Sequence, residues 1–174
     1  FEFKEQQDKA MHNVTKVYKE VEAEFEKLTG RKYGLFETYK TNDADIIILA
    51  MSSMGGTAKV VSDVLREKGE KVGVIRLKMF RPFPTKEIAK AIGKAKAVAV
   101  FEKAMSFGAA TNPLALEVKT ALYETSSRPM IVNFVVGLGG RDVPPMTFVD
   151  GIEKTKGYLK KGQAPLYETL GVRK

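Results

Sequence analysis

A repeated alternation of buried strands and helices limits the folds that this chain can adopt. Residues 45–52 (DIIILAMS) form a near-continuous apolar run, which is typical of a strand covered on both faces. Similar runs occupy residues 71–79, 96–101 and 129–136. Helical patterns separate or follow them over residues 57–68, 85–93, 113 to about 124 and 145 to about 156. Repeated βαβ units predict an α/β fold, a three-layer sandwich around a mostly parallel sheet of about five strands.

The first strand of the sheet is predicted at residues 33–38, where Tyr33, Leu35 and Glu37 alternate with Gly34, Phe36 and Thr38. The turn-like segment KTNDAD follows at residues 40–45. We therefore expect a β-hairpin over residues 33–52, which would make its first strand an antiparallel edge of the sheet.

A long helix is predicted at residues 5–29, ended by Gly30. Its apolar residues are spaced alternately by three and four positions, so they share one narrow stripe. They are Met11, Val14, Tyr18, Val21, Phe25 and Leu28. The stripe packs either on the core of this chain or on another domain or subunit. The predicted organisation is a helical lead-in at 1–32, an α/β domain at 33–156 and a loosely structured basic tail at 157–174.

Composition narrows the possible chemistry. The 174-residue chain has no cysteine and one histidine, and it carries a net charge of +8. Without cysteine it has no thiolate nucleophile and no cysteine ligand for an iron–sulfur cluster. Its longest apolar run, Ile46 to Met51, is too short to span a bilayer, and we expect a cytoplasmic protein without a membrane partner. A basic run near the end has Tyr158 as its one aromatic neighbour, so nucleic acid is not the expected partner.

Glycine and proline gather in the four segments that follow the predicted parallel strands, at residues 52–59, 80–84, 102–113 and 136–145. In a parallel sheet these segments meet at the carboxyl ends of the strands, where ligands and partners bind. The residues expected to face a partner or ligand are Gly55, Gly56, Thr57, Arg81, Phe83, Ser106, Phe107, Gly108, Gly139, Gly140, Arg141 and Asp142.

These segments do not carry a known nucleotide or catalytic motif. SSMGGTAK (52–59) lacks the glycine and lysine spacing of a P-loop, and GLGGRD (137–142) is not G-x-G-x-x-G. A tight strand-to-helix turn explains both segments. His12 lies on the predicted first helix, away from any nucleophile, and no acidic cluster has metal-ligand spacing. We therefore predict no catalytic, cofactor-binding or metal-binding residue in this chain.

The segment FRPFP (80–84) places an arginine at the end of a strand and between an aromatic residue and two prolines. Pro82 and Pro84 keep the residues before them out of the helical region. Two interpretations fit: a rigid connector with a solvated Arg81, or an arginine held out to contact a carboxylate or phosphate of another domain.

The motifs together resemble the second domain of the α subunit of 2-oxoacid:ferredoxin oxidoreductases, most closely the pyruvate enzymes. The resemblance covers essentially the whole chain and depends on RPFP, on VAVFEKAMSFG (98–108), on NPLALEVKTALY (112–123) and on GLGGRD, in that order. This domain is similar to the carboxyl-terminal domain of transketolase, and the resemblance implies that fold for residues 33–156.

The resemblance also implies a multi-subunit enzyme. Such enzymes bind thiamine diphosphate and Mg²⁺, decarboxylate a 2-oxoacid, pass electrons through iron–sulfur clusters to ferredoxin and use coenzyme A. This chain has no G-D-G motif followed by paired asparagines for the diphosphate. It is expected to be a carboxyl-terminal domain, inactive alone, whose partners are a preceding domain and the other subunits. Arg81 and Arg141 would then face the thiamine-binding domains.

Two other functional classes stay open at this point. One is a free-standing α/β module that binds a phosphorylated small molecule or a nucleotide, which the glycine-rich strand ends allow. The other is a basic nucleic-acid binder, which the net charge of +8 allows and which would show salt-dependent retention on DNA or RNA.

Overall fold

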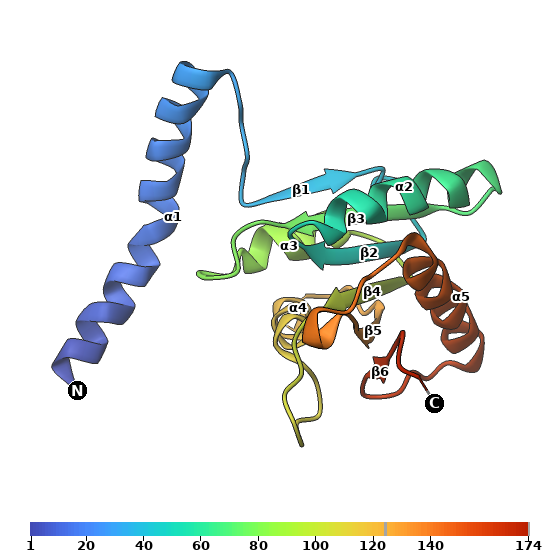
Figure 1. The fold of residues 1–174 in the computed structure, drawn as a ribbon. Coiled ribbons are helices and arrows are strands. Elements are labelled where there is room, and N and C mark those ends of the chain that lie inside the picture. Colours follow the sequence, from blue (N-terminus) through green and yellow to red (C-terminus); the bar gives the residue numbers. More distant parts are fainter. Residues whose placement is uncertain (124, 174) are drawn as a thin grey trace.

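Strand β2 (Ile46–Met51) lies inside a six-stranded sheet in the computed structural model, which describes residues 1–123 and 125–173 (Figure 1). The order across the sheet is β1-β3-β2-β4-β5-β6, and every neighbouring pair is parallel except β1 with β3. The predicted three-layer α/β fold, its mostly parallel sheet and its antiparallel edge strand are confirmed.

The elements follow the predicted alternation closely. In chain order they are α1 (Glu2–Thr29), β1 (Phe36–Tyr39), β2, α2 (Met54–Glu67), β3 (Val72–Leu77), α3 (Thr85–Ile92), β4 (Ala97–Glu102), α4 (Pro113–Tyr123), β5 (Met130–Val135), a 3₁₀ turn η1 (Leu138–Gly140), α5 (Pro145–Lys161) and β6 (Glu168–Thr169). The predicted end of the fourth helix near residue 124 lies outside the described residues.

The predicted β-hairpin over residues 33–52 was wrong. Strand β1 pairs with β3, with Phe36 opposite Leu77, while β2 lies on the other side of β3. The connection from β1 to β2 therefore crosses β3, and it does so at Gly73. A Cβ on Gly73 would lie 2.7 Å from the backbone oxygen of Lys40, so only glycine lets the two backbones come this close.

The helices cover both faces of the sheet. Helices α2 and α5 pack on one face, whose core includes Ile48, Phe101 and Phe134. Helices α3 and α4 pack on the other, whose core includes Leu49 and Val100. Adjacent residues of one strand thus enter different cores, because successive side chains of a strand point to opposite faces. This double burial explains why β2, β3 and β4 are apolar almost throughout.

The expectation of a loosely structured tail at 157–174 was wrong for much of that segment. Helix α5 continues to Lys161, and β6 adds a parallel strand beside β5. Glu168 of β6 bonds back to α5: its carboxylate lies 2.5 Å from Lys154 Nζ and accepts a hydrogen bond of 2.5 Å from the Tyr158 hydroxyl. This carboxylate raises the pKa of Tyr158 to about 12. Glu168 thus ties β6 to Lys154 and Tyr158 of α5.

Helix α1 extends away from the sheet, and none of its residues is buried (Figure 1). The helix forms hydrogen bonds with the segment that directly follows it. The Tyr18 hydroxyl donates to the Gly34 carbonyl at 3.0 Å, and Glu22 accepts from the amide of Tyr33 at 3.0 Å. The apolar stripe therefore does not pack on this chain's own sheet. Of the two interpretations, packing on the chain's own core is excluded for the described residues.

Helix α5 approaches the sheet closely at one glycine. The rings of Phe101, Phe134 and Phe148 form a cluster. The centroid of the Phe101 ring lies 5.1 Å from that of Phe134 and 4.6 Å from that of Phe148. Gly151 lies against this cluster, and a Cβ there would come within 2.4 Å of the Phe101 ring. Because all three rings are fully buried, a Cβ at this position would require the packed rings to shift.

We predict that Gly151→Ala destabilises the chain by about 1–3 kcal/mol, because it overpacks the aromatic cluster. Gly157→Ala is the matched control in the same helix, where a Cβ would meet nothing within 4 Å. There the better helix propensity of alanine should stabilise the chain by about 0.5–1 kcal/mol. Urea unfolding of both variants measures the difference, and equal effects of the two substitutions would contradict the close packing.

Candidate functional site

A cavity opens at the carboxyl ends of β2 and β4. These neighbouring strands are followed by connections that leave for opposite faces of the sheet. After β2 the chain enters α2 on one face of the sheet, and after β4 it enters α4 on the other. The segments that follow the strands therefore diverge and leave a gap between them, the arrangement in which open α/β sheets bind ligands. The cavity has a volume of about 440 Å³.

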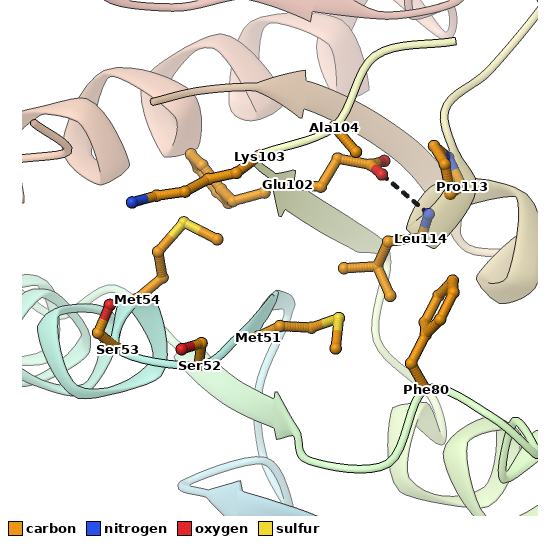
Figure 2. A pocket seen from close by; sticks show the side chains of 11 residues that line it. Met51, Ser52, Ser53, Met54, Phe80, Glu102, Lys103, Ala104, Pro113 and Leu114 are labelled. Atoms are coloured by element: carbon orange, nitrogen blue, oxygen red, sulfur yellow. Dashed lines mark hydrogen bonds between the residues drawn. The ribbon is translucent and has the colours of Figure 1, made fainter. Parts of the chain in front are cut away.

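The cavity is mainly apolar with a few polar groups. Its walls come from the end of β2, the start of α2, the end of β4, the start of α4 and Phe80 after β3. The lining residues are Met51, Ser52, Ser53, Met54, Phe80, Phe101, Glu102, Lys103, Ala104, Pro113 and Leu114. Figure 2 shows Met51, Phe80 and Leu114 at one end of the cavity and the ammonium of Lys103 at the other.

Glu102 is the most unusual group in this lining, because it is a carboxylate with only 4% of its surface exposed. It ends β4 and reaches the first turn of α4, where it accepts hydrogen bonds from the amides of Leu114 at 2.9 Å and Ala115 at 3.2 Å. These are unpaired amides at a helix start, and a carboxylate is favoured there by the helix dipole. Glu102 therefore caps α4 from another element.

Two asparagines extend this contact into the loop before α4. Asn133 of β5 donates to Glu102 at 2.8 Å, and Asn112 donates to Asn133 at 2.8 Å. The side-chain oxygen of Asn112 accepts from the amide of Ser106 at 2.8 Å. The sequence predicts α4 to begin at Pro113 with Asn112 as its cap. The start is confirmed, but Glu102 fills the capping role, while Asn112 holds the 103–112 loop.

Burial raises the pKa of Glu102 above its ordinary value, and the amides of Leu114 and Ala115 and the side chain of Asn133 offset part of this rise. All three partners are donors, which suits an acceptor-only carboxylate. Sequence reasoning missed Glu102 and Asn133. The available signal is one polar residue inside the apolar strand IVNFVV and an acid at the end of VAVFE.

Ser52 joins β2 to α2 in a left-handed conformation, with φ of 57°. Few residues other than glycine adopt it, and such strain is concentrated at functional sites. A serine on a strand-to-helix turn is also the position of a nucleophile in hydrolases. The single histidine lies on α1, and no hydrogen bond joins Ser52 to a base among the described residues. The geometry therefore does not support nucleophilic catalysis at Ser52.

Three of the sequence-predicted site residues lie elsewhere than expected. Helix α2 begins at Met54 rather than after Gly56, so Gly55, Gly56 and Thr57 form its first turn. Gly55 is buried, and a Cβ there would come within 2.4 Å of the Arg76 side chain. Close packing of α2 on β3 therefore explains this glycine, and an open phosphate loop does not.

Arg81 has a partner within its own chain. Its guanidinium lies 2.8 Å from the carboxylate of Glu117 on α4 and 4.2 Å from the centre of the Phe80 ring. Phe83 packs edge-on against Phe80, with ring centroids 6.4 Å apart. The Arg81–Pro82 peptide bond is cis. FRPFP joins β3 to α3, and its arginine binds Glu117 of α4 rather than being fully solvated, so a contact of Arg81 with another domain stays a prediction. Half of the Arg81 side chain, 52%, stays exposed.

The remaining predicted residues lie on exposed loops at the same edge of the sheet. Ser106, Phe107 and Gly108 belong to the 103–112 loop, and the Phe107 side chain is 90% exposed. Gly139 and Gly140 belong to the 3₁₀ turn η1 after β5. Arg141 donates a hydrogen bond to the Gly171 carbonyl, which ties this turn to the tail. Asp142 is exposed beside it.

The described residues include no group of three or more His, Cys, Asp or Glu side chains that could hold a metal ion. Within the same residues, no helix is long and apolar enough to cross a membrane. We assign no step of cofactor chemistry to the side chains of this chain.

The model of one protein family, the pyruvate:ferredoxin oxidoreductase core domain II, matches residues 44–148. The chain belongs to this family. Among its curated relatives, the pyruvate synthase subunit PorA of Thermotoga maritima is 48% identical to it over 83% of the chain. PorA of Pyrococcus furiosus is 43% identical over 88%, and the ketoisovalerate oxidoreductase subunit VorA of Pyrococcus horikoshii is 41% identical over 82%.

The chain spans well under half of these relatives: 37% of the first, 39% of the second and 36% of the third. Two solved structures share its fold. A 2-oxoglutarate:ferredoxin oxidoreductase from Magnetococcus marinus matches 71% of this chain and 20% of its own, with a TM-score of 0.53 and 22% identity. A split-gene transketolase matches 72% of this chain and 42% of its own, with a TM-score of 0.54 and 17% identity. The transketolase-like fold implied by the sequence is confirmed.

We predict that Glu102→Gln lowers the free energy of unfolding by about 1–3 kcal/mol near pH 7. The side-chain amide of glutamine would face one of the three buried donors and leave it unsatisfied. The raised pKa of Glu102 adds a pH dependence. A raised carboxyl pKa contributes stability that is complete below the ordinary value of 4.5 and is lost as pH rises through the folded-state pKa.

The advantage of the wild type over Glu102→Gln should therefore grow as the pH falls through this pKa. Chemical unfolding at several pH values measures it. The exposed Glu67→Gln on α2 is the control, with an expected change within about 0.5 kcal/mol. An advantage that shrinks on acidification would contradict this account.

Proposed function

We propose that this chain is the carboxyl-terminal, transketolase-C-like domain of the α subunit of a thiamine-diphosphate-dependent 2-oxoacid:ferredoxin oxidoreductase, acting in the cytoplasm. Its role is assembly: it holds domains and subunits around an active site that it does not itself contain. Pyruvate is the favoured substrate, because the relatives of 48% and 43% identity are pyruvate synthase subunits. The ketoisovalerate relative, at 41%, supports the wider 2-oxoacid class.

The uncovered stripe of α1 is the observation that carries this proposal. Val21 is 58% exposed and Leu28 is 85% exposed on a 28-residue helix without a buried residue. An isolated helix gains little stability from propensity, and an amphipathic face is stabilised by packing. The spacing of the stripe suits a helix packed along a partner. The chain also spans well under half of its relatives, which supports a partner within a larger subunit or complex.

The loops at the carboxyl edge of the sheet form the second part of the proposed interface. Phe107 projects from the 103–112 loop with 90% of its side chain exposed, as expected of an aromatic anchor. Arg141 lies at the same edge, on the turn after β5. Arg81 is also there and keeps about half of its surface free beside Glu117. We place the thiamine-binding domains opposite these loops, with neither arginine taking part in the chemistry.

The cofactors of the proposed enzyme belong to its other parts. Thiamine diphosphate, Mg²⁺ and the iron–sulfur clusters require ligands that this chain does not offer: its sequence has no cysteine, and its described residues include no metal-binding cluster. The solved 2-oxoglutarate:ferredoxin oxidoreductase has coenzyme A bound, which supports coenzyme A as a co-substrate of the proposed complex. Ferredoxin would meet the complex through the subunits that carry the clusters.

We predict that the isolated chain neither binds thiamine diphosphate with micromolar affinity nor oxidises pyruvate. Isothermal titration calorimetry measures the first property, and reduction of ferredoxin measures the second. Adding the remaining parts of the enzyme should restore pyruvate-dependent reduction of ferredoxin. Micromolar binding of thiamine diphosphate by the chain alone, or full activity of the other parts without it, would refute the assembly role.

The α1 stripe offers a second test. We predict that Val21→Asn weakens assembly with the other parts of the enzyme by about fivefold or more, because it removes apolar area from a helix–helix contact. The isolated chain should change stability by less than about 0.5 kcal/mol, because Val21 is 58% exposed in it. Lys19→Asn is the control, with the same new residue on an exposed position outside the stripe.

Analytical ultracentrifugation of mixtures measures assembly, and hydrogen exchange of the complex measures protection of residues 5–29. Equal assembly of the two variants, together with an unprotected helix in the complex, would show that the stripe has no partner.

A further inference from the structure

We propose that the cavity between the ends of β2 and β4 is a binding site for a small amphiphilic carboxylate, a molecule with one anionic head and a short apolar body. The proposal is independent of the assembly role, because it concerns a ligand rather than a partner chain. The geometry of the cavity defines both parts of the ligand.

The size and place of the cavity suit a small molecule. Its volume of about 440 Å³ lies in the range of small-ligand pockets, roughly 300–1,000 Å³. It also lies where the connections from β2 and β4 leave for opposite faces, which is the usual ligand position in an open α/β sheet. Its walls belong to five different segments of one chain, so the cavity exists without a partner.

The apolar body of the ligand has a defined place. Met51, Phe80 and Leu114 converge at one end of the cavity (Figure 2). Met51 has an unbranched side chain, which adapts to differently shaped apolar groups. This end therefore favours an alkyl chain and does not select one exact length.

The anionic head has a place at the other end. The ammonium of Lys103 has no ion-pair or hydrogen-bond partner among the described residues, and the hydroxyls of Ser52 and Ser53 have none there either. Figure 2 shows these groups on facing walls at the end away from Phe80. The stem of Lys103 packs on Gly137, where a Cβ would come within 2.9 Å of its Cε, so its position along the rim is restricted.

Glu102 also lines the cavity, and its charge has to be compatible with an anion. Its carboxylate points to the start of α4, away from the Lys103 ammonium, and is bonded to two backbone amides and to Asn133 (Figure 2). Those donors and the positive end of the helix compensate its charge. The head of the ligand therefore lies beside Lys103, and the uncharged body lies between it and Glu102.

Octanoate and octanamide are suitable probes, because they share the apolar body and differ in the charge of the head. We expect octanoate to shift the methyl NMR signals of Met51, Met54 and Leu114 saturably in the 174-residue chain. Lys103→Met should weaken octanoate about two- to fivefold, as expected for an exposed ion pair, and should leave octanamide unchanged. Lys160→Met, which removes an exposed lysine at the end of α5, should change neither.

Ala104→Phe tests the cavity itself, because it fills the space between the walls and should abolish binding of both probes while the thermal transition is retained. Absence of a saturable shift with octanoate would overturn the proposal, as would equal weakening of both probes by Lys103→Met. Equilibrium dialysis of labelled octanoate against the assembled oxidoreductase completes the test. Binding by the assembly supports a ligand site, whereas binding by the isolated chain alone would show that a partner chain fills the cavity and would overturn it.

Discussion

The parallel pairing of β2 with β4 is the constraint on which the rest of the structure depends. From this pair, the chain leaves β2 for one face of the sheet and β4 for the other. The two connections cannot close over the same strand ends, so a cavity is left between them. The same divergence brings the end of β4 to the start of α4, and there Glu102 meets the unpaired amides.

Close backbone packing at glycine positions then determines how the layers fit. Gly73 lets the β1–β2 connection cross β3, Gly55 lets α2 lie on Arg76, and Gly151 lets α5 lie on the Phe101 ring. In each case a Cβ would come within 2.7 Å of a neighbouring atom. These glycines therefore serve packing between elements. For Gly55, this role explains why SSMGGTAK resembles a phosphate loop without having the spacing of one.

The structure also distinguishes the sheet with its covering helices, which bury their own apolar residues, from α1, which leaves its apolar stripe exposed. The sheet and its four helices bury two continuous cores, whereas α1 contributes no buried residue. The family match covers residues 44–148, which include every buried residue of these cores except Ile152. An α/β unit with a long uncovered helix and an exposed aromatic loop is suited to organising other domains, which agrees with the proposed role in a 2-oxoacid:ferredoxin oxidoreductase.

By itself, the sequence determined the order of the elements, the double burial of the sheet and the family, because these depend on local periodicity and on short ordered motifs. The Ile46–Met51 run and the start of α4 at Pro113 are examples. Only the tertiary structure decided that the connection from β1 to β2 crosses β3, that Glu117 is the partner of Arg81 and that Glu102 caps α4. These contacts join residues far apart along the chain, so no pattern among neighbouring residues predicts them.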